Sequence, residues 1–354
     1  MGRFLVVTWE GGGNVTPMVL LAGALASRGH DVGAVAPTSL QDRFLAAGTE
    51  LVLSPDGWLA SAADVLGAVE RFAPGVVVVD YMLTGARCGA EAAALPTVAL
   101  VHTLYGALLL DGAPNPIGMS SPVDALNDVR GPLGLDRIER HADLLDTCEL
   151  VVVAAPRQLD DEPPGSEPAN VVYAGPIVES ADPSTTWEPP GGPADEWPLV
   201  VVSLGTAGAD PAREAAVLGR IIEALGKLPV RGLVNLPTSI DPATFDPPDR
   251  VELAGYVPHA AVLPHADLVV THAGLGTVNA ALVHGLNLVC LPLDREQPDN
   301  ARAVERIRAG CVLDPDATAD EVATAIEHQL QRERPAPLVV DLDPTLDRIE
   351  ALVR

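Results

Sequence analysis

The chain has 354 residues, of which 48% are hydrophobic and 20% are charged, so it is long enough for two domains with separate cores and too apolar to be disordered. Its formal net charge of -26 argues against nucleic acid or an anionic membrane as the main partner, because phosphate binding needs a clustered basic surface. No apolar run approaches the roughly 20 residues of a transmembrane helix, and the N-terminal run is too brief for a signal peptide, so we expect a cytoplasmic protein.

The first half alternates short apolar runs with stretches rich in alanine and leucine. The expected elements, in chain order, are a strand at Phe4–Thr8, a helix at Pro17–Arg28, and strands at Asp31–Ala36, Gly75–Asp80, Thr97–His102 and Leu150–Ala154. Short buried strands separated by helices are typical of a parallel, doubly wound α/β sheet.

Residues 179–198 are rich in Pro, Gly, Asp and Glu, and we interpret them as an interdomain linker between a first domain at 1–178 and a second at 199–342. A C-terminal helix at 343–354 could pack back on the first domain. The second domain repeats the alternation, with expected elements at Leu199–Ser203, Ala212–Leu225, Gly232–Asn235, Val251–Ala254, Leu268–Thr271, Val278–His284, Leu288–Leu291, Asn300–Ala309 and Ala319–Gln331.

The four cysteines show no CxxC pair and no histidine at zinc spacing, so we expect reduced core thiols and no metal site. They are Cys88, Cys148, Cys290 and Cys311.

A turn between the expected strand Leu268–Thr271 and the following helix has the features of an anion site. The first N–H groups of a helix have no intrahelical partner, and the helix dipole adds about half a positive charge there. Gly274 and Gly276 let the backbone approach a ligand, while His272 and Thr277 supply an imidazole and a hydroxyl. This turn therefore predicts a diphosphate site.

Five segments in the part of the chain between residues 173 and 301 agree in order and spacing with the inverting glycosyltransferases of family 1. These segments are Tyr173-Ala174-Gly175-Pro176-Ile177, Ser203-Leu204-Gly205-Thr206, Gly255-Tyr256-Val257-Pro258-His259, His272 through Thr277, and Pro292 through Ala301. The chain thus resembles this family, whose GT-B fold has two Rossmann-like domains with parallel sheets facing an interdomain cleft.

The resemblance implies a nucleotide-sugar donor site that needs no metal and no cofactor. Tyr256 would stack on the base, the Val257 backbone would read its edge, and Glu296 and Gln297 would contact the sugar hydroxyls. The diphosphate would be held by Ser203, Gly205, Thr206, His272, Gly274, Gly276 and Thr277.

One departure from the family pattern concerns the donor. The family usually has a glutamate eight residues after the diphosphate histidine, where it bonds the ribose hydroxyls, and here that position is Ala280. Burial of a ribose 2′-hydroxyl without a hydrogen-bond partner would weaken donor binding by roughly 1–3 kcal/mol. A 2′-deoxyribose has no such hydroxyl, so we expect a dTDP-sugar as co-substrate, with a UDP-sugar as the second choice.

A second departure concerns the catalytic base. Gly13-Asn14-Val15-Thr16-Pro17 aligns with the family segment whose histidine deprotonates the acceptor, and the amide of Asn14 cannot take that role. Asp80, in the context of the aspartate that normally orients that histidine, is the favoured base, directly or through a water. His102 is the second option, and an acceptor acidic or nucleophilic enough to need little help is the third.

The expected activity is inverting O-, N- or C-transfer of a deoxysugar to a small hydrophobic natural product, by a monomer or homodimer. Residues expected to contact the acceptor are Gly13, Trp58, Thr103 and Tyr105. Three alternatives stay open: a binding homologue without activity, a sugar-nucleotide epimerase on the same fold, and a dinucleotide-dependent oxidoreductase. The oxidoreductase would need a Gly-x-Gly-x-x-Gly fingerprint and an acidic residue at the end of the next strand. Here Gly11-Gly12-Gly13 is followed by Thr16 at the position of the last glycine, and the strand Asp31–Ala36 does not end in an acidic residue.

Overall fold

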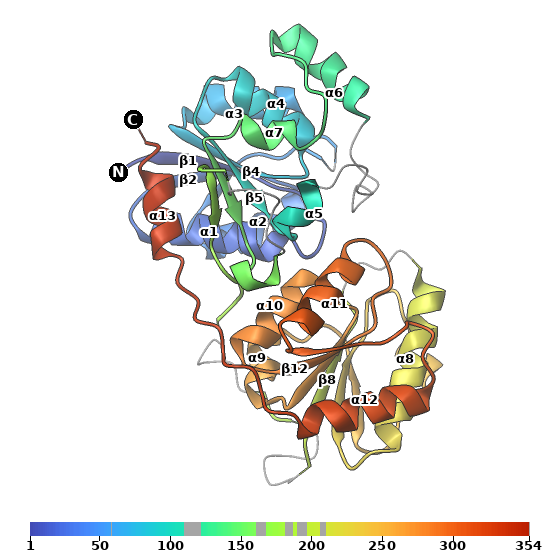
Figure 1. Ribbon diagram of the computed structural model, residues 1–354. Coiled ribbons are helices and arrows are strands. Elements are labelled where there is room, and N and C mark those ends of the chain that lie inside the picture. The colour runs from blue at the N-terminus through green and yellow to red at the C-terminus, as the bar shows by residue number, and fades with distance from the viewer. Residues whose placement is uncertain are drawn as a thin grey trace. The chain divides into compact units, whose positions relative to one another are not determined.

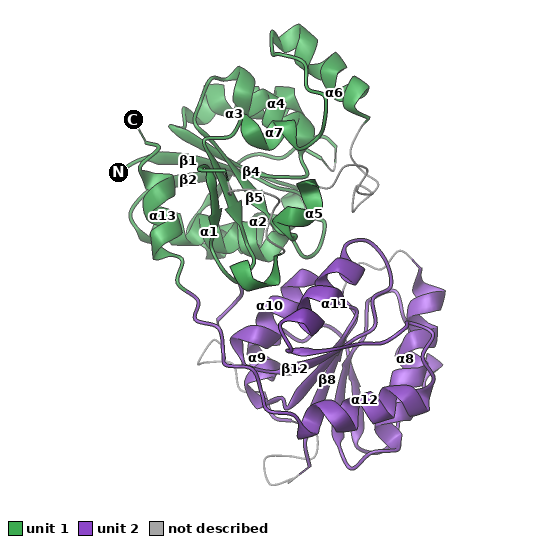
Figure 2. Ribbon diagram, viewed as in Figure 1, with its two compact units in different colours: residues 1–177, 341–354 green, residues 178–340 purple. Residues whose placement is uncertain are grey.

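The computed structural model describes residues 1–57, 59–109, 122–160, 168–180, 187–189, 197–205 and 210–353. It forms two compact units (Figure 2): Met1–Ile177 with Asp341–Arg354, and Val178–Val340. Trp58 and Thr206, two residues expected to bind ligands, lie outside the described residues.

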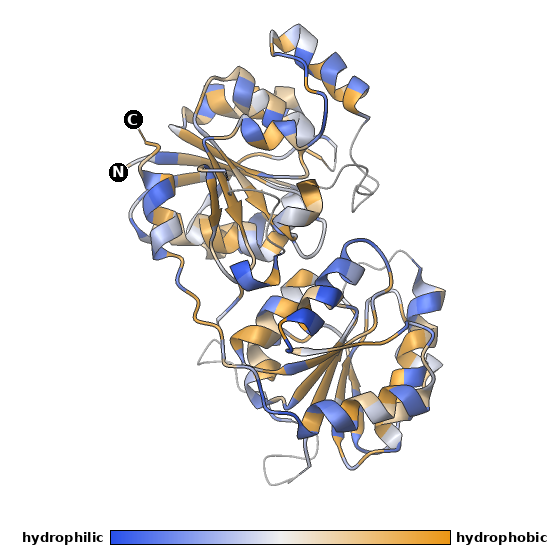
Figure 3. Cartoon of the chain, in the orientation of Figure 1, coloured by the Kyte–Doolittle hydropathy of each residue, from blue (hydrophilic) through white to orange (hydrophobic). Residues whose placement is uncertain are grey.

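Unit 1 is built on a parallel sheet of seven strands in the order β3-β2-β1-β4-β5-β6-β7. Val and Leu dominate these strands, and β4 and β5 at the centre are buried throughout because helices cover both faces (Figures 1 and 3). The strands are β1 Arg3–Val7, β2 Asp31–Val35, β3 Glu50–Leu53, β4 Val76–Asp80, β5 Thr97–Val101, β6 Leu150–Val153 and β7 Val171–Tyr173.

The helices of unit 1 form two layers, because alternate residues of each strand face opposite sides. Val6 and Val78 pack with α1 on one face, whereas Val7 and Val79 pack with α3 and α4 on the other (Figure 1). The helices are α1 Val15–Ser27, α2 Gln41–Ala46, α3 Ala62–Phe72, α4 Thr84–Ala92, α5 Tyr105–Leu109, α6 Val123–Arg130, α7 Asp143–Asp146 and α13 Asp343–Glu350.

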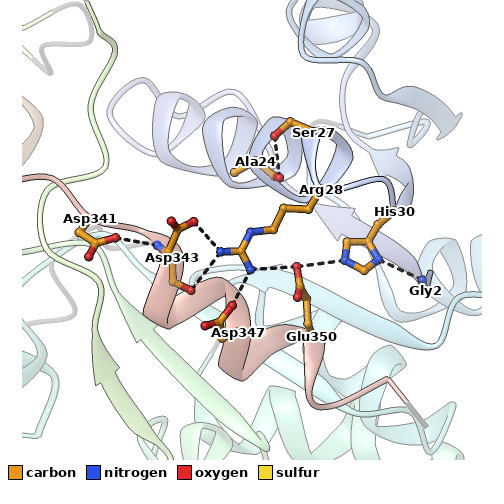
Figure 4. A network of polar contacts seen from close by, with 9 residues as sticks. All are labelled: Gly2, Ala24, Ser27, Arg28, His30, Asp341, Asp343, Asp347 and Glu350. Atoms are coloured by element: carbon orange, nitrogen blue, oxygen red, sulfur yellow. Dashed lines mark hydrogen bonds and ion pairs between the residues drawn. The ribbon is translucent and has the colours of Figure 1, made fainter.

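The C-terminal helix α13 belongs to unit 1. Its Leu346 and Ile349 are buried in the core that α1 covers. At the end of α1, Arg28 binds the carboxylates of Asp343, Asp347 and Glu350 at 2.5, 2.7 and 3.1 Å (Figure 4). The side chain of Glu350 also lies 3.0 Å from Nε2 of His30, whose Nδ1 accepts from the Gly2 N–H. A polar network therefore ties the two ends of the chain to α1.

Unit 2 has a parallel sheet of six strands in the order β10-β9-β8-β11-β12-β13. These are β8 Leu199–Ser203, β9 Arg231–Asn235, β10 Val251–Ala254, β11 Leu268–Thr271, β12 Asn287–Cys290 and β13 Gly310–Val312. Helices α8 Pro211–Gly226 and α12 Ala319–Gln331 pack on one face, with α9 His259–Val262, α10 Leu275–Val283 and α11 Gln297–Arg306 completing the unit (Figure 1).

The strand order reverses next to β8 in unit 2 and next to β1 in unit 1. At such a switch point the loops beyond the carboxyl ends of the strands diverge and leave room for a ligand. The residues that follow β8 and β11 in unit 2, and those that follow β1 and β4 in unit 1, are therefore where a site is expected.

Within the described ranges, no helix combines the length and apolarity needed to cross a membrane, and no group of three or more His, Cys, Asp or Glu side chains could hold a metal ion. The four cysteines are free thiols, with Cys88, Cys148 and Cys290 buried and Cys311 half-buried.

Candidate active site

The predicted diphosphate turn joins β11 to α10. Gly274 is extended and precedes the first turn of α10, while Ala273 takes a left-handed conformation with φ of 66°. Two side chains hold this conformation: Thr271 Oγ1 accepts from the Ala273 N–H at 3.2 Å, and Asn300 Nδ2 donates to the Ala273 carbonyl at 3.0 Å. The backbone N–H groups at the start of α10 are thereby fixed at the switch point beside β8.

The ring of His272 lies between two glycine turns. A Cβ atom on Gly274 would come within 2.6 Å of its Nε2 and one on Gly205 within 2.9 Å, so both positions need glycine for this packing. Loss of hydration lowers the pKa of His272 to about 4, and the charge of Arg295 contributes to the decrease, against the opposing effect of a hydrogen bond to the Ser203 backbone. The imidazole is therefore neutral near pH 7.

Two further predicted donor residues end the neighbouring strands. Ser203 ends β8, and its hydroxyl lies 3.1 Å from Nε2 of His259, whose pKa is lowered by burial. Tyr256 follows β10 and is 67% exposed, which is unusual for a large ring. The next carbonyl, of Val257, accepts from Nδ2 of Asn235 at 3.4 Å. An exposed ring on a held backbone segment can stack on a base.

The loop between β12 and α11 carries the two residues predicted to bind the sugar. The Oε1 atom of Gln297 accepts from the N–H groups of Leu293 and Asp294 at 2.8 and 3.1 Å, and its Nε2 donates to Asp294 Oδ1 at 2.8 Å. Both polar atoms of the Gln297 side chain therefore bind the loop between β12 and α11. The sequence did not suggest this structural role. Glu296 is half-buried just before α11.

The remaining donor-side positions lie on α10. Gly276 is exposed and Thr277 is buried in the first turn, and Ala280 is buried one turn further on, at 7% exposure. The methyl group of Ala280 presents no hydrogen-bonding atom at the family's ribose-binding position.

In unit 1 the structure brings Asn14 together with Asp80 and His102, the two residues considered for the base. Asp80, at the end of β4, is fully buried. Its Oδ2 accepts from Asn14 Nδ2 at 2.9 Å, and its Oδ1 accepts from the Met82 N–H at 3.0 Å and lies 3.1 Å from Nε2 of His102. Strands β4 and β5 are adjacent and parallel, so residues at their carboxyl ends meet at one edge.

Asn14 holds this cluster together. Its Nδ2 also donates to the Trp9 carbonyl at 2.8 Å and lies 3.3 Å from Thr8 Oγ1, and its Oδ1 accepts from the Gly11 N–H at 3.1 Å. The ring of His102 packs edge-on against Tyr81 at 4.8 Å between centroids and keeps 13% of its side chain exposed. Sequence reasoning treated Asp80 and His102 as alternatives, whereas in the structure they form one pair.

Of the residues expected to bind the acceptor, Gly13 precedes Asn14 in sequence, and Thr103 and Tyr105 follow His102. Gly13 is exposed, while Thr103 and Tyr105 are buried just after His102. The N–H groups of Tyr105 and Gly106 donate to the carboxylate of Asp160 at 2.5 and 2.9 Å, and Tyr173 donates its hydroxyl proton at 3.0 Å. Burial raises the pKa of Asp160. Sequence reasoning missed this residue, which fixes the start of α5 from the segment that follows β6.

Comparison with known proteins identifies the family. Residues 155–335, about half of the chain, match the family of UDP-glucoronosyl and UDP-glucosyl transferase. The 4'-demethylrebeccamycin synthase of Lentzea aerocolonigenes is 27% identical over 376 aligned residues, which cover 88% of this chain and 87% of that protein.

Solved structures agree on the fold. The glycotransferase of kitacinnamycin has a TM-score of 0.76 at 22% identity and covers 100% of this chain and 94% of its own. Glycosyltransferase VinC, solved in complex with dTDP, has a TM-score of 0.74 at 18% identity, with 99% of both chains covered. The resemblance and the GT-B fold predicted from sequence are confirmed. The chain is a glycosyltransferase that belongs to the UDP-glucoronosyl and UDP-glucosyl transferase family.

Proposed function

We propose that this glycosyltransferase moves a deoxysugar from a dTDP-sugar to a small hydrophobic natural-product acceptor, with inversion at the anomeric carbon and with His102 as general base. Two findings support the substrate classes: similarity to the 4'-demethylrebeccamycin synthase along most of the chain, and the fold shared with a glycosyltransferase solved with dTDP. The residues below supply the chemistry.

The preference for dTDP rests on Ala280. This residue is buried on α10, at the position where the family pattern places a ribose-binding carboxylate. A ribose 2′-hydroxyl brought against a methyl group would lose its hydrogen bond to water and gain no bond from this side chain, whereas a deoxyribose loses nothing there.

The choice of His102 rests on its contact with Asp80. The Asp80 carboxylate is fully buried and accepts from Asn14 and Met82, so it has no surface from which to take a proton from an acceptor. His102 has exposed surface and is held by Asp80 at 3.1 Å, the arrangement in which a carboxylate orients an imidazole and stabilises its protonated form. We therefore favour His102 over Asp80, the first choice from sequence.

His102 takes the proton from the acceptor's nucleophilic atom while that atom attacks the anomeric carbon opposite the diphosphate, and Asp80 stabilises the imidazolium. The departing diphosphate would accept hydrogen bonds from the N–H groups of the β11–α10 turn and meet the positive end of α10. These donors supply the stabilisation that Mg²⁺ supplies in other enzymes.

Replacement of His102 tests this assignment. We expect His102→Gln to lower kcat about 10²–10⁴-fold with an alcohol acceptor, because general-base catalysis is lost. Initial rates across pH measure this, and the variant should also lose the ionisation that controls kcat/KM in the native enzyme. The affinity for dTDP, measured by calorimetry, should not change, since the donor residues lie in unit 2.

Asp80→Asn serves as the companion variant, because it keeps the shape of the carboxylate and removes its charge. It should also lower kcat while sparing dTDP affinity. Native kcat in His102→Gln would refute the base assignment and leave an acceptor that needs no base as the explanation.

A further inference from the structure

Arg295 occupies an unusual backbone position in the loop between β12 and α11. Its φ of 54° lies in the left-handed region, which glycine adopts easily and an arginine adopts at a cost. Gln297 fixes this conformation through its hydrogen bonds to Leu293 and Asp294 on the other side of the turn. The loop therefore holds an arginine in place where a glycine would fit with less strain.

The loop that carries Arg295 begins beside the diphosphate turn. Strand β12 pairs in parallel with β11 up to Cys290 and Thr271, and Asn300 on the helix after the loop donates to the Ala273 carbonyl of the turn at 3.0 Å. The charge of Arg295 also contributes to the lowered pKa of His272. The side chain of Arg295 is exposed, and no hydrogen bond or ion pair joins it to another described residue. In contrast, Arg302 on the following helix is paired with Asp299.

A diphosphate needs a positive charge that the residues predicted from sequence do not supply. His272 is neutral near pH 7, so it adds no charge. The start of α10 contributes about half a charge. The chain as a whole carries -26, which opposes an anionic ligand. A full positive charge beside the turn would offset the repulsion between the negatively charged chain and the diphosphate.

One nearby carboxyl could compete for Arg295. Glu214, in the first turns of α8, is buried at 4% exposure, and its Oε2 has no hydrogen-bond partner among the described residues. Burial and the charges of Asp294 and Asp210 raise its pKa and outweigh the opposing charge of Arg295, which favours the neutral form. Glu214 is therefore a weak partner, and the guanidinium stays available for a ligand.

We propose that Arg295 is a donor-binding residue that pairs with the diphosphate of the nucleotide sugar held at the β11–α10 turn. A guanidinium binds phosphate oxygens through two parallel N–H bonds, which gives both charge and orientation. This assignment rests on the proposed function, because it requires a nucleoside diphosphate donor. Arg295 would add a positive charge to a proposed diphosphate site whose other residues are neutral.

Calorimetric titration with dTDP and with thymidine tests the assignment. We expect Arg295→Gln to weaken dTDP binding about 10- to 100-fold, the range for losing a charged hydrogen-bonded pair, and to leave thymidine binding unchanged. Arg295→Lys, which keeps the charge, should retain most of the dTDP affinity. Arg302→Gln is the matched control, because it removes one positive charge from the adjacent helix, and its affinity should equal that of the native chain.

Two results would overturn the assignment: native dTDP affinity in Arg295→Gln, or an equal loss of dTDP and thymidine binding, which would indicate a distorted loop. Failure of the proposed function looks different. In that case the native chain itself would bind neither dTDP nor UDP, whatever stands at position 295.

Discussion

His272 shows how a single side chain links the stability of unit 2 to its ligand site. Packing against Gly205 and Gly274 removes water from the ring, and this loss lowers its pKa to about 4, below the roughly 6.5 of a hydrated histidine. As the pH falls below about 6.5, His272 binds a proton in the unfolded chain but stays neutral in the folded chain until about pH 4. The contribution of this residue to the free energy of unfolding is therefore lost between about pH 6.5 and pH 4.

His272→Gln should remove that part of the pH dependence. Between about pH 7 and pH 5, we expect the free energy of unfolding of the native chain to fall by about 2 kcal/mol more than that of the variant. Urea unfolding at the two pH values measures the difference. His328→Gln, a change at an exposed position on α12, is the control and should behave as the native chain. Equal pH dependence in native chain and His272→Gln would contradict the assignment of a buried neutral ring.

At the residue scale, sequence reasoning named Asp80 and His102 but did not predict that they contact each other. It placed Asp80 and His102 at the ends of separate strands, which is correct, but one sequence does not state that those strands are neighbours. The role of Gln297 could not be predicted for a related reason. Its hydrogen bonds depend on the backbone conformation of Leu293 and Asp294. The sequence alone does not distinguish a glutamine that binds a sugar from one that binds its own loop.

The element that matters most for donor binding is the turn into α10. Gly274→Ala would place a methyl group within 2.6 Å of the His272 ring, so the ring or the turn must move. We expect a lower melting temperature and dTDP binding weakened about tenfold or more, since a displaced helix start loses its aligned N–H groups. Differential scanning fluorimetry and calorimetry measure the two effects.

Gly276→Ala is the matched control in the same turn. An added Cβ there meets nothing within 4 Å, and alanine favours a helix over glycine by up to about 1 kcal/mol. This variant should melt at the native temperature or above it, which separates the contact of Gly274 with His272 from the general effect of an added methyl group in this turn. If both alanine variants bind dTDP as tightly as the native chain, the close packing around His272 does not contribute to the affinity for dTDP.

Element prediction worked best where strands are buried on both faces. The runs at β1, β4, β5, β8 and β11 stand out as uninterrupted apolar segments, and the structure places each within a residue or two of the expected bounds. The short strands β3, β7 and β13 were not singled out. Each has three or four residues at or near a sheet edge and is only partly buried, which leaves little apolar signal.

At the scale of the whole molecule, the alternation of strands and helices predicts two parallel sheets, and the structure has them. The ion-pair network that fastens α13 to Arg28 could not be predicted, because the partners lie 315 to 322 residues apart. The identity of the donor is likewise a property of the whole site. In our proposal it depends on Tyr256, the diphosphate turn, Arg295 and the lack of a carboxylate at Ala280 acting together.

The comparison of dTDP with UDP in one calorimetric experiment tests the central claim most directly. We predict that the native chain binds dTDP about tenfold more tightly, the equivalent of one lost hydrogen bond to the ribose 2′-hydroxyl. Ala280→Glu, which restores a carboxylate, should narrow the difference by strengthening UDP binding. Equal affinities, or tighter binding of UDP by the native chain, would contradict the account.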